Sequence, residues 1–201
     1  CSAWTTVTVS AAGGGVVNPS CTDATPWYST GGIWGYRKIF QIDDAKVPAT
    51  QSNFPVMISL TSDAGLQANA RPDGFDILFT NSSGTKLDHE IEKYVSGTGE
   101  LIAWVKVPSL SSTADTKIYM YYGNPSAINQ QNVAGTWDSN YAAVYHYPNG
   151  STLSALDSTI NNKNGTISGA SATTGKIDGS ASFGGSTNMH KIKSTITATA
   201  Q

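Results

Sequence analysis

The sequence predicts an all-β protein, built as an antiparallel β-sandwich of the jelly-roll or immunoglobulin-like kind. Short runs of strand-forming residues, separated by turn residues, recur between residues 36 and 124, and several alternate between apolar and polar side chains. Charged residues make up only 13% of the 201 residues, whereas Ser, Thr, Asn, Gly and Ala are abundant and interleaved with Tyr and Trp. This composition is typical of extracellular β-proteins, so we expect an extracellular or cell-surface location.

Residues 1–35 are expected to form one strand and a long connector. Residues 4–9 alternate in the manner of a strand, and three consecutive glycines at 13–15 then break the pattern. The first residue is Cys rather than Met, so we expect that the chain begins either after a processing event or within a longer sequence.

Cys1 and Cys21 are the only two cysteines of the chain. A single pair at this spacing suits one disulfide formed in an oxidising compartment. Two alternatives stay open: Cys1 could carry the lipid of a bacterial lipoprotein, or both side chains could be inert thiols.

Six runs are expected to form the sandwich over residues 36–124. They are residues 36–42, 54–60, 75–80, 86–95, 100–107 and 117–122. A short helix is expected at residues 63–70, capped by Asp63 and ended before Pro72. Period-2 alternation predicts the core side chains, which are Ile39, Val56, Ile58, Leu60, Phe75, Ile77, Phe79, Trp104 and Tyr121 or its neighbours on the same strand.

A polar linker is expected over residues 125–136, followed by a second β-segment over residues 137–201. Weak strand signals appear at 165–168, 181–183 and 192–199, too few to close a core of their own. On the last strand, Ile192, Ser194 and Ile196 share one face. The sequence predicts no sheet within the chain that this strand could join, and an unpaired strand favours pairing with another domain or chain.

Six motifs in the first part of the chain occur in the order of a known family. They are WGYRK at 34–38, NFPV at 53–56, DGFDILF at 73–79, LDHEIE at 87–92, AWVKVP at 103–108 and IYMYYGN at 118–124. Over about residues 33–130 the chain resembles the microbial family called domain of unknown function 2341. The resemblance implies a β-sandwich module of surface or secreted multidomain proteins, with no established enzymatic activity.

Members of that family commonly precede a laminin-G or concanavalin-like jelly roll. Residues 137–146, 157–166 and 175–183 are similar to the beginning of such a domain, although Gly184 and Gly185 stand where an acidic residue and a glycine are usual. A concanavalin-like sandwich needs well over a hundred residues, so the resemblance implies an incomplete second domain here.

The segment DHEIE contains the residues that most suggest chemistry. On an extended strand Asp88, Glu90 and Glu92 share one face at roughly 6.5–7 Å intervals. That spacing suits a metal such as calcium, and it overlaps the carboxylate separation of inverting glycosidases. The alternative, which we favour, is a structural face whose charges pair with nearby lysines, Lys86, Lys93 or Lys106.

Aromatic residues suggest a second candidate site, since flat rings bind sugars through their apolar faces. The candidates are Trp27, Tyr28 and Trp34, of which the first two follow Pro26 in a loop. The alternative is that these rings pack in the core, as we expect of Trp104.

Other classes of function lack their required features. The net charge of −2 gives no basic surface for nucleic acid, and no run of about 18 apolar residues could span a membrane. The three histidines lack zinc-site spacing, and no nucleophile elbow or phosphate-binding loop occurs. We therefore expect a non-catalytic binding or adhesion module for a glycan or another surface protein, without a cofactor unless calcium binds. The alternatives are a subunit of an extracellular filament or envelope assembly, joined through its C-terminal segment, and a glycosidase that uses Glu90 and Glu92.

Overall fold

The computed structural model describes residues 27–148, 151–185 and 189–192 of the chain. The chain divides into a first compact unit that ends at Thr136 and a second compact unit that begins at Trp137. Cys1 and Cys21 lie outside the described residues, as do Ser194 and Ile196. Within the described part, no helix is long and apolar enough to cross a membrane.

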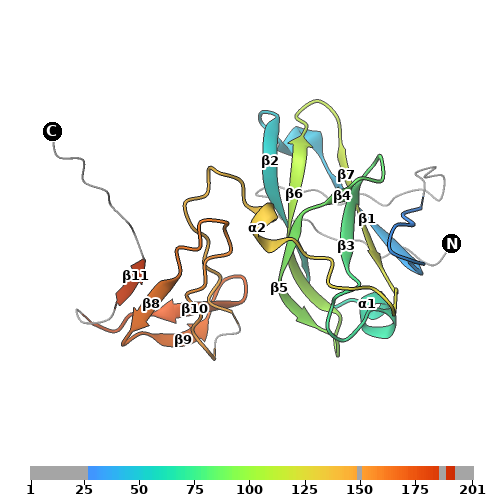
Figure 1. Cartoon of the computed structure of the whole chain (residues 1–201). Coiled ribbons are helices and arrows are strands. Elements are labelled where there is room, and N and C mark those ends of the chain that lie inside the picture. The colour runs from blue at the N-terminus through green and yellow to red at the C-terminus, as the bar shows by residue number, and fades with distance from the viewer. Residues whose placement is uncertain (1–26, 149–150, 186–188, 193–201) are drawn as a thin grey trace. The chain divides into compact units, whose positions relative to one another are not determined.

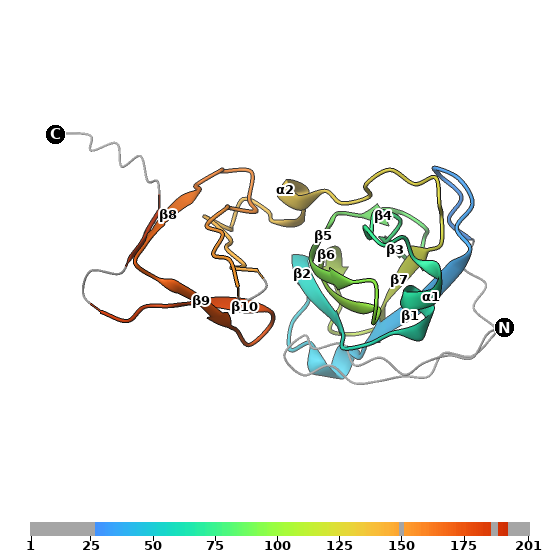
Figure 2. The ribbon, with the colours of Figure 1, turned by 90° about the horizontal axis from the view of Figure 1, so that it is seen from below.

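The first unit is a sandwich of two antiparallel sheets (Figures 1 and 2). The four-stranded sheet has the order β1 (Tyr36–Ile42), β7 (Thr116–Tyr122), β3 (Leu78–Asn81) and β4 (Lys86–Leu87). The three-stranded sheet has the order β2 (Gln51–Leu60), β6 (Glu100–Leu110) and β5 (His89–Val95). Two short helices, η1 (Asp44–Lys46) and α1 (Ala64–Asn69), lie in connections between the sheets, and a third, α2 (Val133–Thr136), follows β7. The predicted all-β sandwich is confirmed.

The run predicted as one strand at 86–95 is divided between the two sheets. Residue Asp88 separates β4, in the four-stranded sheet, from β5, in the three-stranded sheet. Further along β5, Ile91 pairs with Ala103 and Lys93 pairs with Ile102, so Glu92 is the extra residue of a β-bulge. The bulge interrupts the simple alternation that the sequence suggested for this segment.

The main core lies between the two sheets and follows the predicted alternation of β2. Val56, Ile58 and Leu60 are buried there, together with Ile77 and Phe79 beside and on β3. Two predicted members, Phe75 and Trp104, are not buried, and in both cases the reason is local. Phe75 is 37% exposed because its segment is a turn and β3 begins only at Leu78. Trp104 is partly exposed because its neighbours Ala103 and Val105 occupy the core face of β6.

A second apolar cluster covers the opposite face of the four-stranded sheet. It contains Trp34, Ile39, Leu78, Tyr119, Tyr121 and Ala127, with Tyr28 packed against it. The predicted core residues Ile39 and Tyr121 are therefore buried, but in this cluster and not between the sheets. Residues on both faces of β7 are buried, so the four-stranded sheet is an inner layer under the segments that contribute Trp34 and Ala127.

The predicted helix is confirmed as α1, with Asp63 as its N-cap. Asp63 Oδ1 accepts the Leu66 N–H at 2.8 Å, and Asp63 Oδ2 forms an ion pair with Lys38 Nζ at 2.9 Å. One carboxylate thus caps α1 and joins it to β1.

The second unit contains two antiparallel strand pairs. One joins β8 (Gly165–Ser168) to β11 (Met189–Ile192), and the other joins β9 (Ser171–Thr174) to β10 (Gly179–Ser182). The expectation that Ile192 has no sheet within the chain is wrong, because Ile192 pairs with Gly165. Both clusters of buried apolar side chains that the described residues contain belong to the first unit. Among the described residues of the second unit, five large apolar side chains are exposed: Leu156, Ile160, Ile177, Phe183 and Met189.

Asp157 organises the loop that precedes β8. Its carboxylate accepts hydrogen bonds from the backbone of Val144, Thr159 and Lys163 at 2.8 to 3.0 Å, and from the Thr159 hydroxyl. Burial raises the pKa of Asp157, but these hydrogen bonds outweigh it and lower the pKa below its ordinary value.

Candidate functional site

Trp27 presents an aromatic ring at the outer side of the four-stranded sheet, and the side chain is held from three directions. The guanidinium carbon of Arg37 lies 4.9 Å from the ring centroid. The ring meets Tyr121 edge to face at 5.6 Å, and its Nε1–H donates to the carbonyl oxygen of Trp34 at 2.8 Å. Trp27 is nevertheless 49% exposed. Arg37 lies over the indole, and about half of the Trp27 surface remains accessible to a ligand.

Arg37 is the centre of this arrangement. Its guanidinium carbon lies 5.2 Å from the ring centroid of Tyr119 and 6.0 Å from that of Tyr121, as well as over Trp27. A guanidinium within about 6 Å of an aromatic face is attracted by the ring quadrupole. Arg37, on β1, therefore contacts Trp27 and also the two tyrosine rings of β7.

The structure brings Trp27, Tyr28 and Trp34 together, but they play different roles. Trp34 is only 2% exposed, and its Nε1–H donates to the Thr30 carbonyl oxygen. Tyr28 is partly buried, with its ring centroid 6.0 Å from Trp34 and 5.9 Å from Tyr121. Trp34 is thus not a surface residue, contrary to its selection as a ligand contact; it fixes the segment that carries Trp27.

The carboxylates of the DHEIE segment contact groups of the chain itself. Asp88 pairs with Lys106 at 2.8 Å and accepts a hydrogen bond from Asn132 Nδ2 at 2.8 Å. Burial raises the pKa of Asp88, but the hydrogen bonds from Lys106 and Asn132 outweigh it and the pKa is lowered. Glu92, at the bulge, accepts a hydrogen bond from Trp104 Nε1 at 2.6 Å, whereas Glu90 is 7% exposed.

These three carboxylates do not converge on a common point. Among the described residues, a single group of three His, Cys, Asp or Glu side chains has ligand atoms within 4.8 Å of one another, and it is a different one. The predicted metal ligands Asp88, Glu90 and Glu92 are therefore not brought together as a three-residue site.

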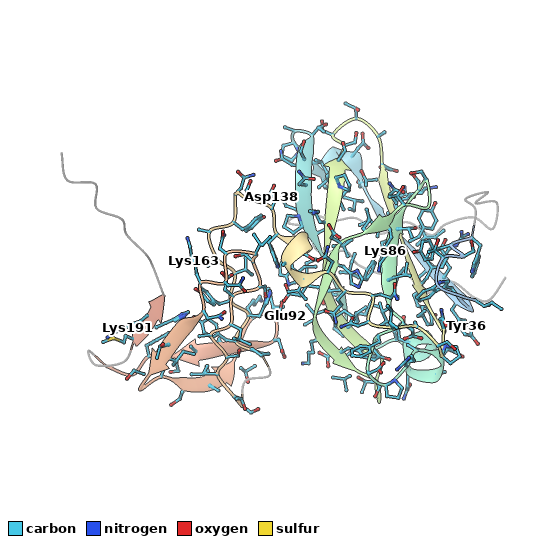
Figure 3. All side chains as sticks on the ribbon, in the orientation of Figure 1. Tyr36, Lys86, Glu92, Asp138, Lys163 and Lys191 are labelled. Carbon is cyan, nitrogen blue, oxygen red and sulfur yellow. The ribbon has the colours of Figure 1, made fainter. Side chains whose placement is uncertain are left out.

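The connector after β7 is docked on β5 and β6. The expectation of a polar linker over residues 125–136 did not include these contacts. Asn132 N–H donates to the His89 carbonyl oxygen at 3.0 Å, and the Ile91 N–H donates to Gln131 Oε1 at 2.7 Å. Lys86, labelled in Figure 3, donates to Gln130 Oε1 at 2.8 Å. Lys106 Nζ also donates to the Gly135 carbonyl oxygen. We call residues 130–136 the docked connector; the Gln131 side-chain amide and the Asn132 N–H satisfy two backbone groups at the edge of β5.

His89 points into the core beside the docked connector. Its Nε2 lies 3.1 Å from the Ile77 carbonyl oxygen and its ring meets Phe79 edge to face at 5.1 Å. Burial is the largest cause of the fall in the pKa of His89 to about 4. The imidazole is therefore neutral near pH 7 and serves packing.

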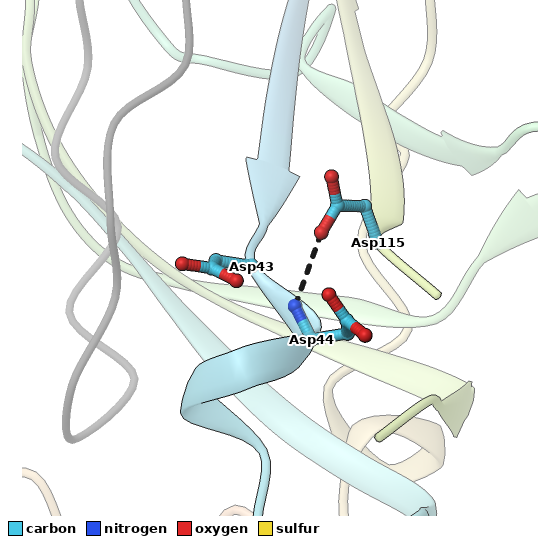
Figure 4. A group of neighbouring side chains, drawn as sticks. All are labelled: Asp43, Asp44 and Asp115. Atoms are coloured by element: carbon cyan, nitrogen blue, oxygen red, sulfur yellow. Dashed lines mark hydrogen bonds between the residues drawn. The ribbon is translucent and has the colours of Figure 1, made fainter. Parts of the chain in front are cut away.

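The group of three acidic side chains is formed by Asp43, Asp44 and Asp115 at the turn after β1 (Figure 4). Asp115 Oδ1 accepts the Asp44 N–H at 3.1 Å, and Asp43 Oδ1 accepts the Ala45 N–H at 2.9 Å. Asp115 is 71 residues from Asp44 in the chain, so no local sequence pattern indicates this group. These carboxylates organise the turn at η1, and they are the residues placed best for a hard cation.

The comparison with known families supports the first of the two resemblances. Residues 73–164 match the model of a family described as Domain of unknown function (DUF2341). No curated protein and no solved structure gives a match. No match extends to the laminin-G or concanavalin-like resemblance, which stays a prediction.

The matched range differs from the one that the motifs suggested. It starts at Asp73 rather than near residue 33, and it ends at Asn164, so it includes the docked connector and the Asp157 loop. Trp27 and Arg37 precede it. Over residues 73–164, the chain is therefore similar to the family described as Domain of unknown function (DUF2341).

Proposed function

We propose that this chain is a non-catalytic, secreted or cell-surface module that binds a glycan through Trp27. The observation that carries the proposal is the half-exposed indole, held by Arg37, Tyr121 and Trp34. An aromatic ring fixed before binding loses little conformational freedom when a ligand stacks on it, which favours affinity.

The chemistry of the exposed face favours a sugar. The indole N–H already donates to Trp34, so the ring offers its apolar face and not a hydrogen bond. A pyranose presents C–H groups on its flat faces, which suit such a surface. The low charge of the chain is consistent with an uncharged partner. The non-catalytic part of the proposal is supported by the carboxylates of Asp88 and Glu92, which bind groups of the chain itself.

Co-sedimentation of the full chain with insoluble polysaccharides tests the proposal. The panel contains cellulose, chitin and peptidoglycan, and the variant is Trp27→Ala. Phe183→Ala is a matched control, because Phe183 is 48% exposed but lies in the second unit. We expect retention by at least one polysaccharide, lost in Trp27→Ala and kept in Phe183→Ala. Absence of retention, or equal retention by both variants, overturns the glycan proposal; retention on a purified surface protein instead would point to the other partner class.

The proposed location has a separate test. Protease treatment of intact producing cells, followed by fractionation, should remove or release the chain before any cytoplasmic marker is cleaved. A chain found with the cytoplasmic marker overturns the location.

A second candidate function is a subunit of an extracellular assembly. The observation that favours it is the set of exposed apolar side chains in the second unit, together with the short strand pair of β8 and β11. Apolar surface and free strand edges both favour association with another chain.

A further inference from the structure

We propose that Asn81 is the acceptor of an N-linked glycan. The residues Asn81, Ser82 and Ser83 fit the pattern Asn-x-Ser/Thr, in which a sugar is attached to the side-chain amide of the asparagine. This inference rests on the secreted or cell-surface location in the proposed function, because this pattern is modified on the secretory route. It adds a modification site to that function and does not depend on the Trp27 surface.

Asn81 ends β3 and begins the turn that leads into β4. Its Oδ1 accepts three hydrogen bonds from this turn: from the Ser83 N–H at 3.0 Å, from the Ser83 hydroxyl at 2.8 Å and from the Thr85 N–H at 2.9 Å. Three donors around one atom identify it as the amide oxygen, so the amide nitrogen takes no part in the turn. The hydroxyl that the pattern requires therefore already lies against the acceptor side chain.

The amide nitrogen of Asn81 is accessible to solvent. It has no hydrogen-bond partner among the described residues, and His190 Nε2 is the one side-chain nitrogen or oxygen there that is both buried and without a partner. Ser82 and Ser83 are exposed, and a Cβ placed on Gly84 would meet no atom within 4 Å. The space around the turn is therefore open to a large substituent.

The other two copies of the pattern do not show this arrangement. Asn149 lies outside the described residues. Asn164 directs its Oδ1 to the Asp157 N–H at 2.9 Å, and Thr166 belongs to the paired strand β8. Along an extended strand, residues two positions apart are separated by about 7 Å. Thr166 is therefore not turned back onto Asn164, and Asn81 is the acceptor that we assign.

The reaction joins Asn81 Nδ2 to the anomeric carbon of an activated sugar. The donor class is a glycan attached to a lipid through a phosphate ester, and a transferase of the secretory route is the catalyst. The new N–C bond forms as the C–O bond to the phosphate breaks, the phosphate leaves with the electron pair, and Nδ2 loses one proton. Oδ1 does not react, so the contacts of the turn survive the modification.

Intact mass and peptide mapping of the chain from the surface fraction of producing cells test the inference. We expect a mass above that of the amino acids by a whole number of sugar units. Fragmentation should locate the added mass on the peptide that contains Asn81. The peptide that contains Asn164 should carry no sugar.

Variants separate the modification from the structural role of the turn. Asn81→Asp keeps an oxygen acceptor for the three hydrogen bonds but has no amide nitrogen, so it should fold and lose the sugar completely. Ser83→Ala should also lose the sugar, whereas Ser83→Thr should keep it because threonine supplies the same hydroxyl. Asn164→Asp is the matched control and should leave the modification unchanged. Thermal unfolding verifies that each variant is folded.

An unmodified Asn81 in a chain that protease reaches on intact cells overturns the inference and leaves the proposed location intact. A modification confined to Asn164, or one that persists at Asn81 in Ser83→Ala, also overturns it. A chain found only with the cytoplasmic marker overturns both the location and this inference.

Discussion

The carboxylate of Asp76 holds the backbone of Gly123, 47 residues further along the chain. Asp76 Oδ2 accepts the Gly123 N–H at 2.8 Å and the Asn124 N–H at 3.1 Å, and Oδ1 accepts the Arg71 N–H at 2.9 Å. Asp76 is fully buried. The two motifs that contain Asp76 and Gly123 thus meet in space, and the contact joins the turn before β3 to the end of β7.

Replacement of Asp76 by Ala should lower the free energy of unfolding by about 3 kcal/mol or more. The reason is that three backbone N–H groups would lose a charged acceptor in a buried place. Urea denaturation measures the change. Asp44→Ala, at a partly exposed turn, is the control and should cost less than about 1 kcal/mol. Similar costs for the two variants would contradict the role given to Asp76.

Acid should destabilise the first unit through His89. The pKa of His89 is depressed from 6.5 to about 4 in the folded chain, mainly by burial. Between these values the unfolded chain binds the proton and the folded chain does not, so stability rises with pH through this window. The contribution is complete above pH 6.5 and falls by about 3 kcal/mol as pH drops towards 4.

Urea unfolding of the unmodified chain and of His89→Gln across this window measures the effect. The glutamine amide can still donate to the Ile77 carbonyl oxygen but does not titrate. The variant should therefore show a smaller loss of stability on acidification. An identical pH dependence in the two proteins would show that His89 is not the group responsible.

Asn132→Ala should loosen the docked connector without unfolding the sandwich. The substitution removes the bonds of the side chain to Asp88 and to the Gly135 N–H, worth about 1 kcal/mol each. Faster amide hydrogen exchange in residues 130–136 and at Ile91 is the expected result. Asn140→Ala, at another exposed asparagine, should leave exchange in this segment unchanged. Unaltered protection in Asn132→Ala would mean that the Asn132 side chain is not needed to hold the connector.

Removal of residues 186–201 tests the assembly hypothesis. The deletion takes away β11 and the segment that contains Ser194 and Ile196. It should abolish any oligomer detected by light scattering, while the thermal unfolding of the first unit stays nearly the same. An oligomer that persists after the deletion would reject pairing through this segment.

Local patterns in the sequence predicted much of the fold but little of the candidate site. The bounds of β1 and β8 agree with the prediction, and the alternation of β2 identified Val56, Ile58 and Leu60 as core residues. Both depend on short-range periodicity. Alternation by itself does not say which face of a strand meets the core, so Trp104 was placed on the wrong face of β6.

The contacts of the candidate site depend on segments that cross the sandwich. Trp27 meets Arg37 and Tyr121 because the segment around Trp34 packs on the outside of a sheet that is buried on both faces. Alternation of apolar and polar residues predicts a sheet with one buried face, so it does not predict this outer layer. The continuous apolar run of β7 is nevertheless typical of a strand that is buried on both faces. The bulge at Glu92 could not be predicted either, because no feature of the DHEIE segment indicates an extra residue.

Coverage of β5 by the docked connector has a consequence for solubility at high local concentration. Open strand edges are templates for aggregation. Besides β5, the edge strands of the two sheets in the first unit are β1, β2 and β4. The edge strand β4 has two residues, and β2 carries Pro55, which lacks an N–H to offer. Within the described residues, β1 is the remaining edge, seven residues long and free of proline. Among the described strands of the first unit, β1 is therefore the edge most open to pairing with another copy of this module.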